Sequence, residues 1–124
     1  MENIFILDGR REILEANVNF YKLPFIHPER ILNEHDFIYM LDGEWKFRQN
    51  QENFTLKKDH ILILTAQNRH LGLTPCSANT KTAYFHASLK NGDRQRKGGE
   101  ELLPNEVLID TLIEASDNKR IKKC

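Results

Sequence analysis

The apolar residues of the middle of this chain fall in short runs separated by polar turns. Residues 37–41 form a run of aromatic and branched side chains that stops at Asp42-Gly43, and further runs cover residues 54–56, 61–64, 70–73 and 82–89. Between them, Trp45 and Phe47 alternate with charged neighbours. Runs of roughly four to eight residues with turns between them are typical of all-β sandwiches and barrels. We therefore predict a mainly β fold.

The two ends of the chain have a different texture. Residues 1–34 contain short apolar pieces split by prolines and by Asp8-Gly9, which predicts short strands and an arm. Residues 91–104 form a charged, glycine-rich connection. We expect residues 1–90 to form a β-barrel with its N-terminal arm, and residues 118–124 to form a solvated basic tail.

A helix is predicted between the connection and the tail, over residues 105–117. Pro104 and Asn105 suit a helix start. The apolar residues that follow recur at the spacing i, i+1, i+4 and i+5, which places them in one stripe of an amphipathic helix. These residues are Leu108, Ile109, Leu112 and Ile113. We expect the stripe to pack on the barrel or on a second copy of the chain.

Composition excludes several classes of protein. The 124 residues carry 18 Lys plus Arg and 18 Asp plus Glu, so no overall field draws the domain to nucleic acid or to an anionic membrane. Two cysteines, Cys76 and Cys124, rule out a disulfide framework. No apolar run approaches the ~20 residues that span a bilayer. With no signal peptide at the N-terminus, we expect a cytoplasmic protein.

Candidate catalytic chemistry is sparse. None of the five histidines are spaced two or four residues apart, so no local metal platform exists, although distant strands could still bring ligands together. The chain has no P-loop, GxGxxG, GxSxG or HExxH motif. Cys76 lies in a turn-like stretch without the basic neighbour that would activate a thiol. We predict no enzyme activity and no cofactor.

His70 and His86 are the histidines to follow, because each lies in or at the start of a predicted strand beside apolar residues. A polar ring there costs free energy unless it finds a partner. Each is either a core histidine bonded to the backbone or a polar contact in a ligand cavity. Tyr39, Trp45 and Tyr84 likewise suit either a core or a pocket wall.

The order of these signals resembles the cupin sensor domain of AraC-type transcription regulators. In residues 30–43, Arg30 precedes an apolar strand that ends in a glycine turn, and residues 54–64 resemble the family's second signature. Residues 65–70 resemble its next turn and histidine, and residues 84–87 its aromatic-x-His strand. The likeness covers about residues 28–89. Lys58 stands where the family has Gly, and Ala66-Gln67 where it has Pro-Gly.

The resemblance implies a cupin double-stranded β-helix, a jelly-roll barrel with a cavity between its sheets. Metal-binding cupins use four ligand positions. Three of these fall near Glu29, Ile31 and Asp36, and only His70 keeps its residue type. We therefore expect no metal centre.

The family's cavity-facing phase predicts which side chains point inward. On the first strand they are Asp36, Ile38, Met40 and Asp42. Beyond Gly43 the phase must flip, since otherwise Trp45 and Phe47 would be exposed and charged residues buried. His70, Thr82, Tyr84 and His86 share the inward set. The predicted ligand site is Asp42, Trp45, His70, Tyr84 and His86, with Trp45 and Tyr84 stacking on a small polar molecule such as a sugar or small acid.

The predicted function is that of a ligand-sensing and dimerisation domain of an AraC-type regulator. We expect a homodimer formed through Leu108, Ile109, Leu112 and Ile113. Too few residues follow Asp117 for a helix-turn-helix, so DNA would be contacted only through a domain absent from this chain. The alternatives are a stand-alone cupin enzyme, such as a metal-dependent isomerase or oxygenase, and a dimerisation module without a ligand.

Overall fold

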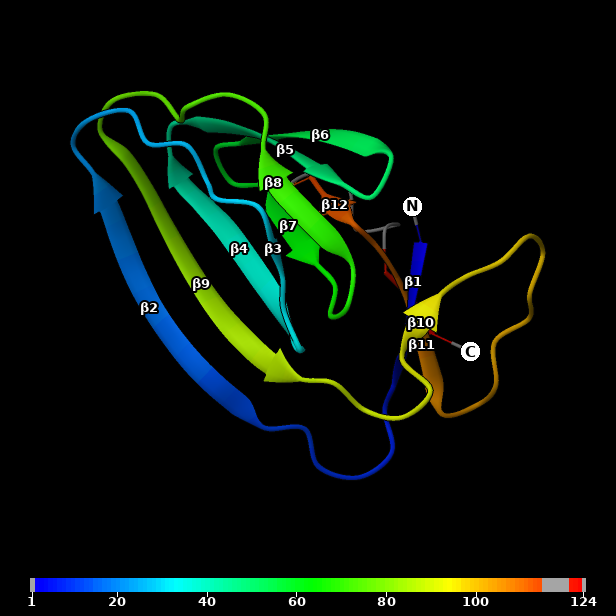
Figure 1. Cartoon of the computed structure of the whole chain (residues 1–124). Helices are drawn as coiled ribbons and strands as arrows, with labels where there is room; N and C mark the ends of the chain where they lie inside the picture. Colours follow the sequence, from blue (N-terminus) through cyan, green and yellow to red (C-terminus); the bar gives the residue numbers. More distant parts are fainter. Residues whose placement is uncertain (1, 115–120, 124) are drawn as a thin grey trace.

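The structure, a computed structural model, describes residues 2–114 and 121–123, and these form three antiparallel sheets (Figure 1). The predicted mainly β fold is therefore confirmed. What we call the large sheet has five strands in the order β12 (Leu112–Ile113), β7 (Ile61–Leu64), β4 (Glu34–Asp42), β9 (Thr80–Ser88) and β2 (Ile13–Tyr21).

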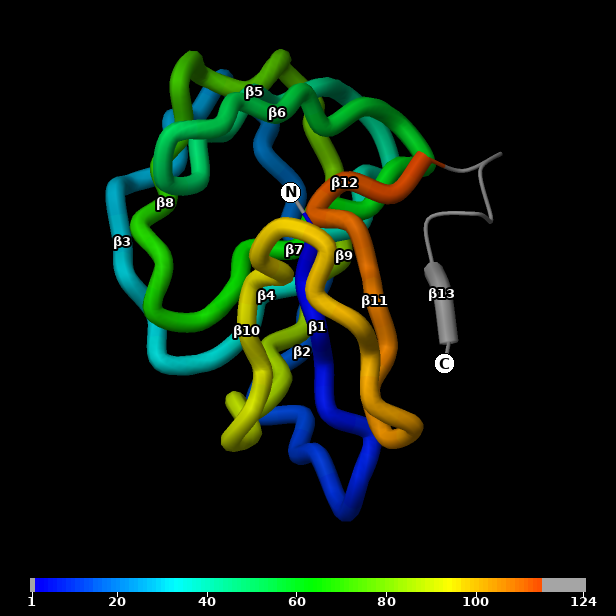
Figure 2. The backbone as a smooth tube through the Cα atoms, turned by 90° about the vertical axis from the view of Figure 1, so that its right-hand side faces the viewer, coloured from blue at the N-terminus to red at the C-terminus, as the bar shows by residue number. Residues whose placement is uncertain are grey.

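Two further sheets complete the molecule. The facing sheet has the order β3 (Arg30–Ile31), β8 (Arg69–Gly72), β5 (Glu44–Gln49) and β6 (Glu52–Lys57). The terminal sheet joins both ends of the chain in the order β10 (Arg94–Gln95), β1 (Glu2–Ile6), β11 (Glu106–Asp110) and β13 (Ile121–Lys123). In Figure 2, β1 runs between β10 and β11, with β5 and β6 at the opposite end of the molecule.

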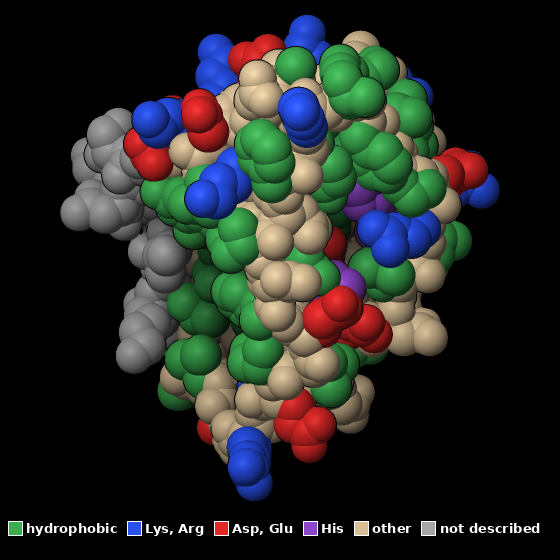
Figure 3. Space-filling model, turned by 90° about the vertical axis from the view of Figure 1, so that its left-hand side faces the viewer, with side chains coloured by type: hydrophobic (Ala, Val, Ile, Leu, Met, Phe, Trp, Pro, Cys, Tyr) green, Lys and Arg blue, Asp and Glu red, His purple; other side chains and the backbone are tan. Residues whose placement is uncertain are grey.

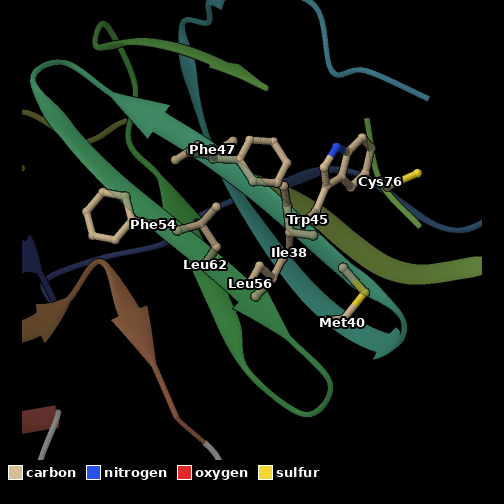
Figure 4. Packing of buried hydrophobic residues seen from close by; sticks show 9 residues of the cluster. Ile38, Met40, Trp45, Phe47, Phe54, Leu56, Leu62 and Cys76 are labelled. Carbon is tan, nitrogen blue, oxygen red and sulfur yellow. The ribbon is translucent and has the colours of Figure 1, made fainter. Parts of the chain in front are cut away.

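The main core lies between the large sheet and the facing sheet. Ile38 and Leu62 of the large sheet pack against Phe47 and Leu56 of the facing sheet, and Trp45 closes one side (Figure 4). Burial of this apolar surface is the dominant favourable contribution to folding. It also sets the spacing of the two sheets and therefore the space left where the core ends.

The predicted alternation of β4 and β5 is confirmed except at one position. Ile38 and Met40 of β4 are buried, and so are Trp45 and Phe47 of β5. Asp42, predicted to face inward, is instead exposed at the end of β4, after a shift in register between Met40 and Asp42. The alternation of buried side chains on β4 therefore ends at Met40, two residues before Asp42.

Gly43 carries the chain from the large sheet to the facing sheet. Its φ of +103° is strained for a residue with a side chain, and a Cβ here would overlap the side chain of Thr80. The crossing lets the buried set change phase between β4 and β5. This is the physical basis of the phase flip expected from the sequence.

The predicted helix over residues 105–117 is wrong for residues 106–110 and 112–113, which form β11 and β12. β11 pairs with β1, so its neighbour is a strand about a hundred residues away that no local pattern reveals. Val107 packs with Phe5 and Ile63 on the outer side of the large sheet. The consecutive apolar residues thus belong to a strand covered on both faces, whose periodicity resembles that of a buried helix.

The remaining predicted ranges fall partly outside the described residues. The structure does not describe residues 115–117 of the predicted helix. Nor does it describe residues 118–120 and 124 of the predicted tail. Residues 121–123 form β13, which pairs with β11. In the described part of the chain, no helix could cross a membrane.

Candidate ligand pocket

A cavity of about 360 Å³ opens beside the core, between the large sheet and the segment of residues 22–29. Its walls come from β2, β4 and β9 of the large sheet, from Trp45 of β5, and from residues 25–30. Figure 3 shows the face onto which it opens: histidine side chains lie in a hollow with a basic side chain on one side and acidic side chains on the other. The volume is within the usual range for small-molecule sites.

Three aromatic side chains form an apolar wall of the pocket. The rings of Tyr21 and Phe25 stack with centroids 5.3 Å apart, and Trp45 meets Tyr21 edge-on at 5.1 Å. The indole Nε1–H of Trp45 is buried and has no hydrogen-bond partner among the described residues. A buried indole N–H normally has a partner, so this wall offers one unused donor.

His27 is positioned by a close approach between residues 22–29 and β8. Gly72 donates its backbone N–H to the carbonyl of His27 at 3.0 Å, and a Cβ on Gly72 would lie 2.8 Å from the backbone nitrogen of His27. The Nδ1–H of His27 donates to the carbonyl of Pro28, and its Nε2 accepts from the Arg30 guanidinium at 2.9 Å. Burial and the charge of Arg30 lower the pKa of His27 to about 4. The ring is therefore neutral and orients Arg30.

Three carboxylates surround one imidazole on another side of the pocket. Nδ1 of His86 lies 3.2 Å from Glu34 Oε1 and 3.5 Å from Glu15 Oε2, and its Nε2 lies 3.5 Å from Asp36 Oδ1. Tyr84 donates its hydroxyl to Glu15 at 2.9 Å. Asp36 is 4% exposed, and its Oδ1 makes no hydrogen bond of good geometry within the described part of the chain. Burial raises the pKa of Asp36 to about 6, although the charge of His86 opposes this.

His70 lies behind His27, with ring centroids 5.3 Å apart. It is 1% exposed, and neither ring nitrogen has a well-aligned partner in the described residues. Burial, together with the electrostatic effects of His27 and Arg30, lowers the pKa of His70 to about 4. This neutral, buried ring supports the back wall of the pocket and does not line it.

The structure brings together part of the predicted site. Trp45, Tyr84 and His86 line the pocket, whereas His70 stands behind it and Asp42 lies outside its walls. The sequence prediction missed His27 and Arg30, which come from a segment without secondary structure or from a two-residue strand.

Other wall residues could have been found from strand parity. Glu15, Asn19 and Tyr21 have the same parity on β2 and all line the pocket. Asp36 was expected to face inward but was left out of the predicted site, and it lines the pocket as well.

A second cavity, of about 450 Å³, lies between β10 and residues 65–68. Most of its charged side chains already have partners: Asp93 binds Arg11 and His35, and Arg94 binds Glu100. It therefore offers a ligand fewer free groups than the first cavity does.

Residues 2–114 contain no group of three or more His, Cys, Asp or Glu side chains arranged to hold a metal ion. Nε2 of His27 already accepts a hydrogen bond from Arg30, so this nitrogen is not free to bind a metal ion.

No protein-family model and no curated protein matches this chain. The pocket is therefore the feature of the molecule that bears on its function.

Proposed function

We propose that this chain is the ligand-sensing and dimerisation domain of an AraC-type transcription regulator, built on a cupin double-stranded β-helix. DNA binding would reside in a helix-turn-helix domain outside this chain, and the protein would act in the cytoplasm. The observation that carries the proposal is the cavity of about 360 Å³, whose walls combine aromatic rings with the unpartnered indole N–H of Trp45 and the poorly satisfied carboxylate of Asp36.

The strand order supports the cupin part of the proposal. From β4 onward the chain passes to the facing sheet for β5 and β6, back to the large sheet for β7, across again for β8, and back for β9. Repeated crossing between two packed sheets is how a jelly roll is wound. The core lies between those two sheets, and the pocket opens where the core ends.

The pocket walls support ligand sensing over a purely structural role. Leaving a buried polar group without a hydrogen bond costs about 1–3 kcal/mol. Trp45 Nε1 carries this cost at the cavity, as judged from the described residues, and Asp36 Oδ1 has only the long 3.5 Å contact with His86 Nε2. A bound small molecule that supplied the partners would remove it. The ligand would contact β2 on one side and residues 22–29 on the other. Binding would then favour one arrangement of these two segments.

Trp45 makes the proposal directly testable, because it is the only tryptophan of the chain and it lines the pocket. A panel of sugars, small acids and amino compounds should contain ligands that raise the melting temperature and change the Trp45 fluorescence together. Asn19→Phe, which adds bulk to a pocket wall, should abolish both responses. Asn91→Phe, at an exposed turn outside the pocket, is the matched control.

Two results would contradict the proposal. If no member of the panel stabilises the protein or changes Trp45 fluorescence, ligand sensing fails and a dimerisation module without a ligand is favoured. If purified protein holds stoichiometric Fe, Mn, Ni or Zn tightly, the stand-alone cupin enzyme is favoured instead.

For the dimerisation part of the proposal, the outer face of the large sheet offers an apolar groove. Val18, Phe37 and Phe85 line it, together with Ile109 and Ile113 of the residues predicted to form the dimer. Leu108 is instead 4% exposed, and Leu112 packs against the main core. The predicted dimerisation residues therefore divide between the groove and the interior.

A second copy of the chain could pair with the edge of the large sheet beside this groove, because β2 is the edge strand and is nine residues long. An antiparallel pair of β2 strands centred on Asn17 would place Ala16 opposite Val18 of the other copy, and would continue the groove across the two-fold axis. Val18 is 52% exposed in a single chain. A long, exposed apolar edge is normally covered in native proteins.

A further inference from the structure

The charges of the pocket walls are arranged on separate sides, and each side is unbalanced. One side carries Arg30 and the other carries Glu15 and Asp36, with Glu34 next to them as a partner of His86. Figure 3 shows the same division on the molecular surface, with basic and acidic groups on either side of the hollow. A ligand that fills the pocket meets both sides.

The basic side has an unused cation. The Arg30 guanidinium donates to a neutral imidazole, Nε2 of His27, and no carboxylate of the described residues lies within ion-pair distance of it. Because His27 fixes one of its N–H groups, the remaining donors of the planar guanidinium are held ready for an acceptor. A carboxylate is the acceptor that a guanidinium fits in bidentate fashion.

The acidic side has an excess of carboxylates. Glu15, Glu34 and Asp36 share the single imidazole of His86, so these three groups keep net negative charge even when that imidazole is protonated. Asp36 is 4% exposed and its Oδ1 lacks a well-aligned donor within the described residues. An ammonium group carries three donors and would satisfy this side.

We infer that the pocket binds a small zwitterion, an α-amino acid with an apolar side chain, whose carboxylate contacts Arg30 and whose ammonium group contacts Asp36 and Glu15. The aromatic wall of Trp45 and Tyr21 would cover the side chain. This inference rests on the proposed function and names its ligand class. A neutral polyol would leave both charge imbalances in place, and a simple acid or amine would correct only one of them.

The experiment compares molecules that differ by one charged group. Isothermal titration calorimetry at neutral pH is run with glycine, L-leucine and L-phenylalanine, then with 3-phenylpropionate, 2-phenylethylamine and D-glucose. We expect L-leucine or L-phenylalanine to bind. For L-phenylalanine, loss of either charged group should weaken binding at least about tenfold, since each forms charge-assisted hydrogen bonds.

Two variants assign the charged groups to their partners. Arg30→Gln should abolish the preference for L-phenylalanine over 2-phenylethylamine, and Asp36→Asn should reduce its preference over 3-phenylpropionate, because Glu15 remains. Arg48→Gln and Asp42→Asn make the same charge changes at exposed positions outside the pocket and should leave both preferences intact. Melting temperatures of all four variants establish that each is folded.

The outcomes separate this inference from the proposed function. Binding of glucose or of a single-charge analogue, with no binding of the three amino acids, overturns the zwitterion and leaves ligand sensing standing. Equal affinity for L-phenylalanine and both analogues also overturns it. If no compound of this set binds but another member of the wider panel does, only the zwitterion inference fails. If no compound of either set binds, both proposals fail.

Discussion

Single residues fix the terminal sheet to the large sheet, and Asp93 is the clearest case. Its carboxylate accepts hydrogen bonds from both Nη atoms of Arg11, from Nε2 of His35, and from the backbone N–H groups of Ile6 and Lys90, at 2.7–2.9 Å. The side chain is 1% exposed. Burial opposes ionisation, but these hydrogen bonds outweigh it and hold the pKa of Asp93 well below its usual range.

Replacing this carboxylate should therefore be costly. We expect Asp93→Asn to lower the free energy of unfolding at pH 7 by about 3–5 kcal/mol, because a buried partner is removed from Arg11. A depressed pKa stabilises the fold above about pH 4, and the benefit is lost as pH falls through the native value. In urea titrations from neutral to acid pH, the difference in free energy of unfolding between wild type and Asp93→Asn should become smaller below about pH 4. Asp42→Asn, at an exposed site, should change stability by less than about 0.5 kcal/mol.

Asp36 should show the opposite dependence on pH. Its native pKa of about 6 lies above the value of an unfolded chain, so the native state binds the extra proton. Ionisation of Asp36 thus lowers the free energy of unfolding by about 3 kcal/mol as the pH rises from about 4 to 6. In urea titrations at several pH values, Asp36→Asn should gain stability relative to wild type over that interval. Parallel pH curves for the two proteins would show that Asp36 is not buried as described.

At the scale of elements, the crossing at Gly43 determines how two sheets share one core. We expect Gly43→Ala to lower the free energy of unfolding by about 2 kcal/mol or more, because the added Cβ meets Thr80 and the backbone has a positive φ. Gly99→Ala is the matched control, since a Cβ there meets no atom within 4 Å and its φ lies outside the positive region. The control should be neutral or slightly stabilising in the same urea titration. Equal losses in both variants would contradict the role of the crossing.

The strand pattern of β5, with one buried face, was predictable from sequence, whereas β11, which is buried on both faces, was wrongly predicted as a helix. Trp45 and Phe47 alternate with charged residues, and only a strand with one face in the core satisfies that pattern. Val107, Leu108 and Ile109 are consecutive and apolar, so period alone cannot distinguish a strand from a helix. The distinction depends on β1, whose residues pair with β11 across the length of the chain. Such pairing is a property of the tertiary structure.

The same limit applies to the candidate site. Tyr84 and His86 were found because strand parity on β9 places both inward. His27 was missed because its position depends on the contact of residues 22–29 with Gly72 of β8, which leaves no periodic signal. Asp42 was wrongly expected to face inward because the register of β4 shifts just before it. Parity predicts side-chain direction within a strand, but it fails at bulges and in connecting segments.

At the scale of the whole molecule, the free edge at β2 connects the pocket to the proposed dimer. The inward residues Glu15, Asn19 and Tyr21 line the pocket, while Ala16 and Val18 of the same strand line the outer groove. A ligand that holds the inner face of β2 would therefore also hold the edge on which we propose that a second copy pairs. If both proposals hold, we expect positive coupling between ligand binding and dimerisation, and linkage makes such coupling reciprocal.

Analytical ultracentrifugation of the wild type and of Val18→Lys tests this arrangement. Lysine at position 18 would place like charges close together across the two-fold axis and a polar group in the groove, so we expect a dimeric wild type and a monomeric variant. Leu103→Lys removes an equally exposed apolar side chain, 57% accessible, outside the groove, and should remain a dimer. A ligand from the binding panel should tighten the wild-type dimer and leave Val18→Lys monomeric. A monomeric wild type, or a variant that still dimerises, would exclude the β2 edge as the interface, and pocket and assembly would then be independent.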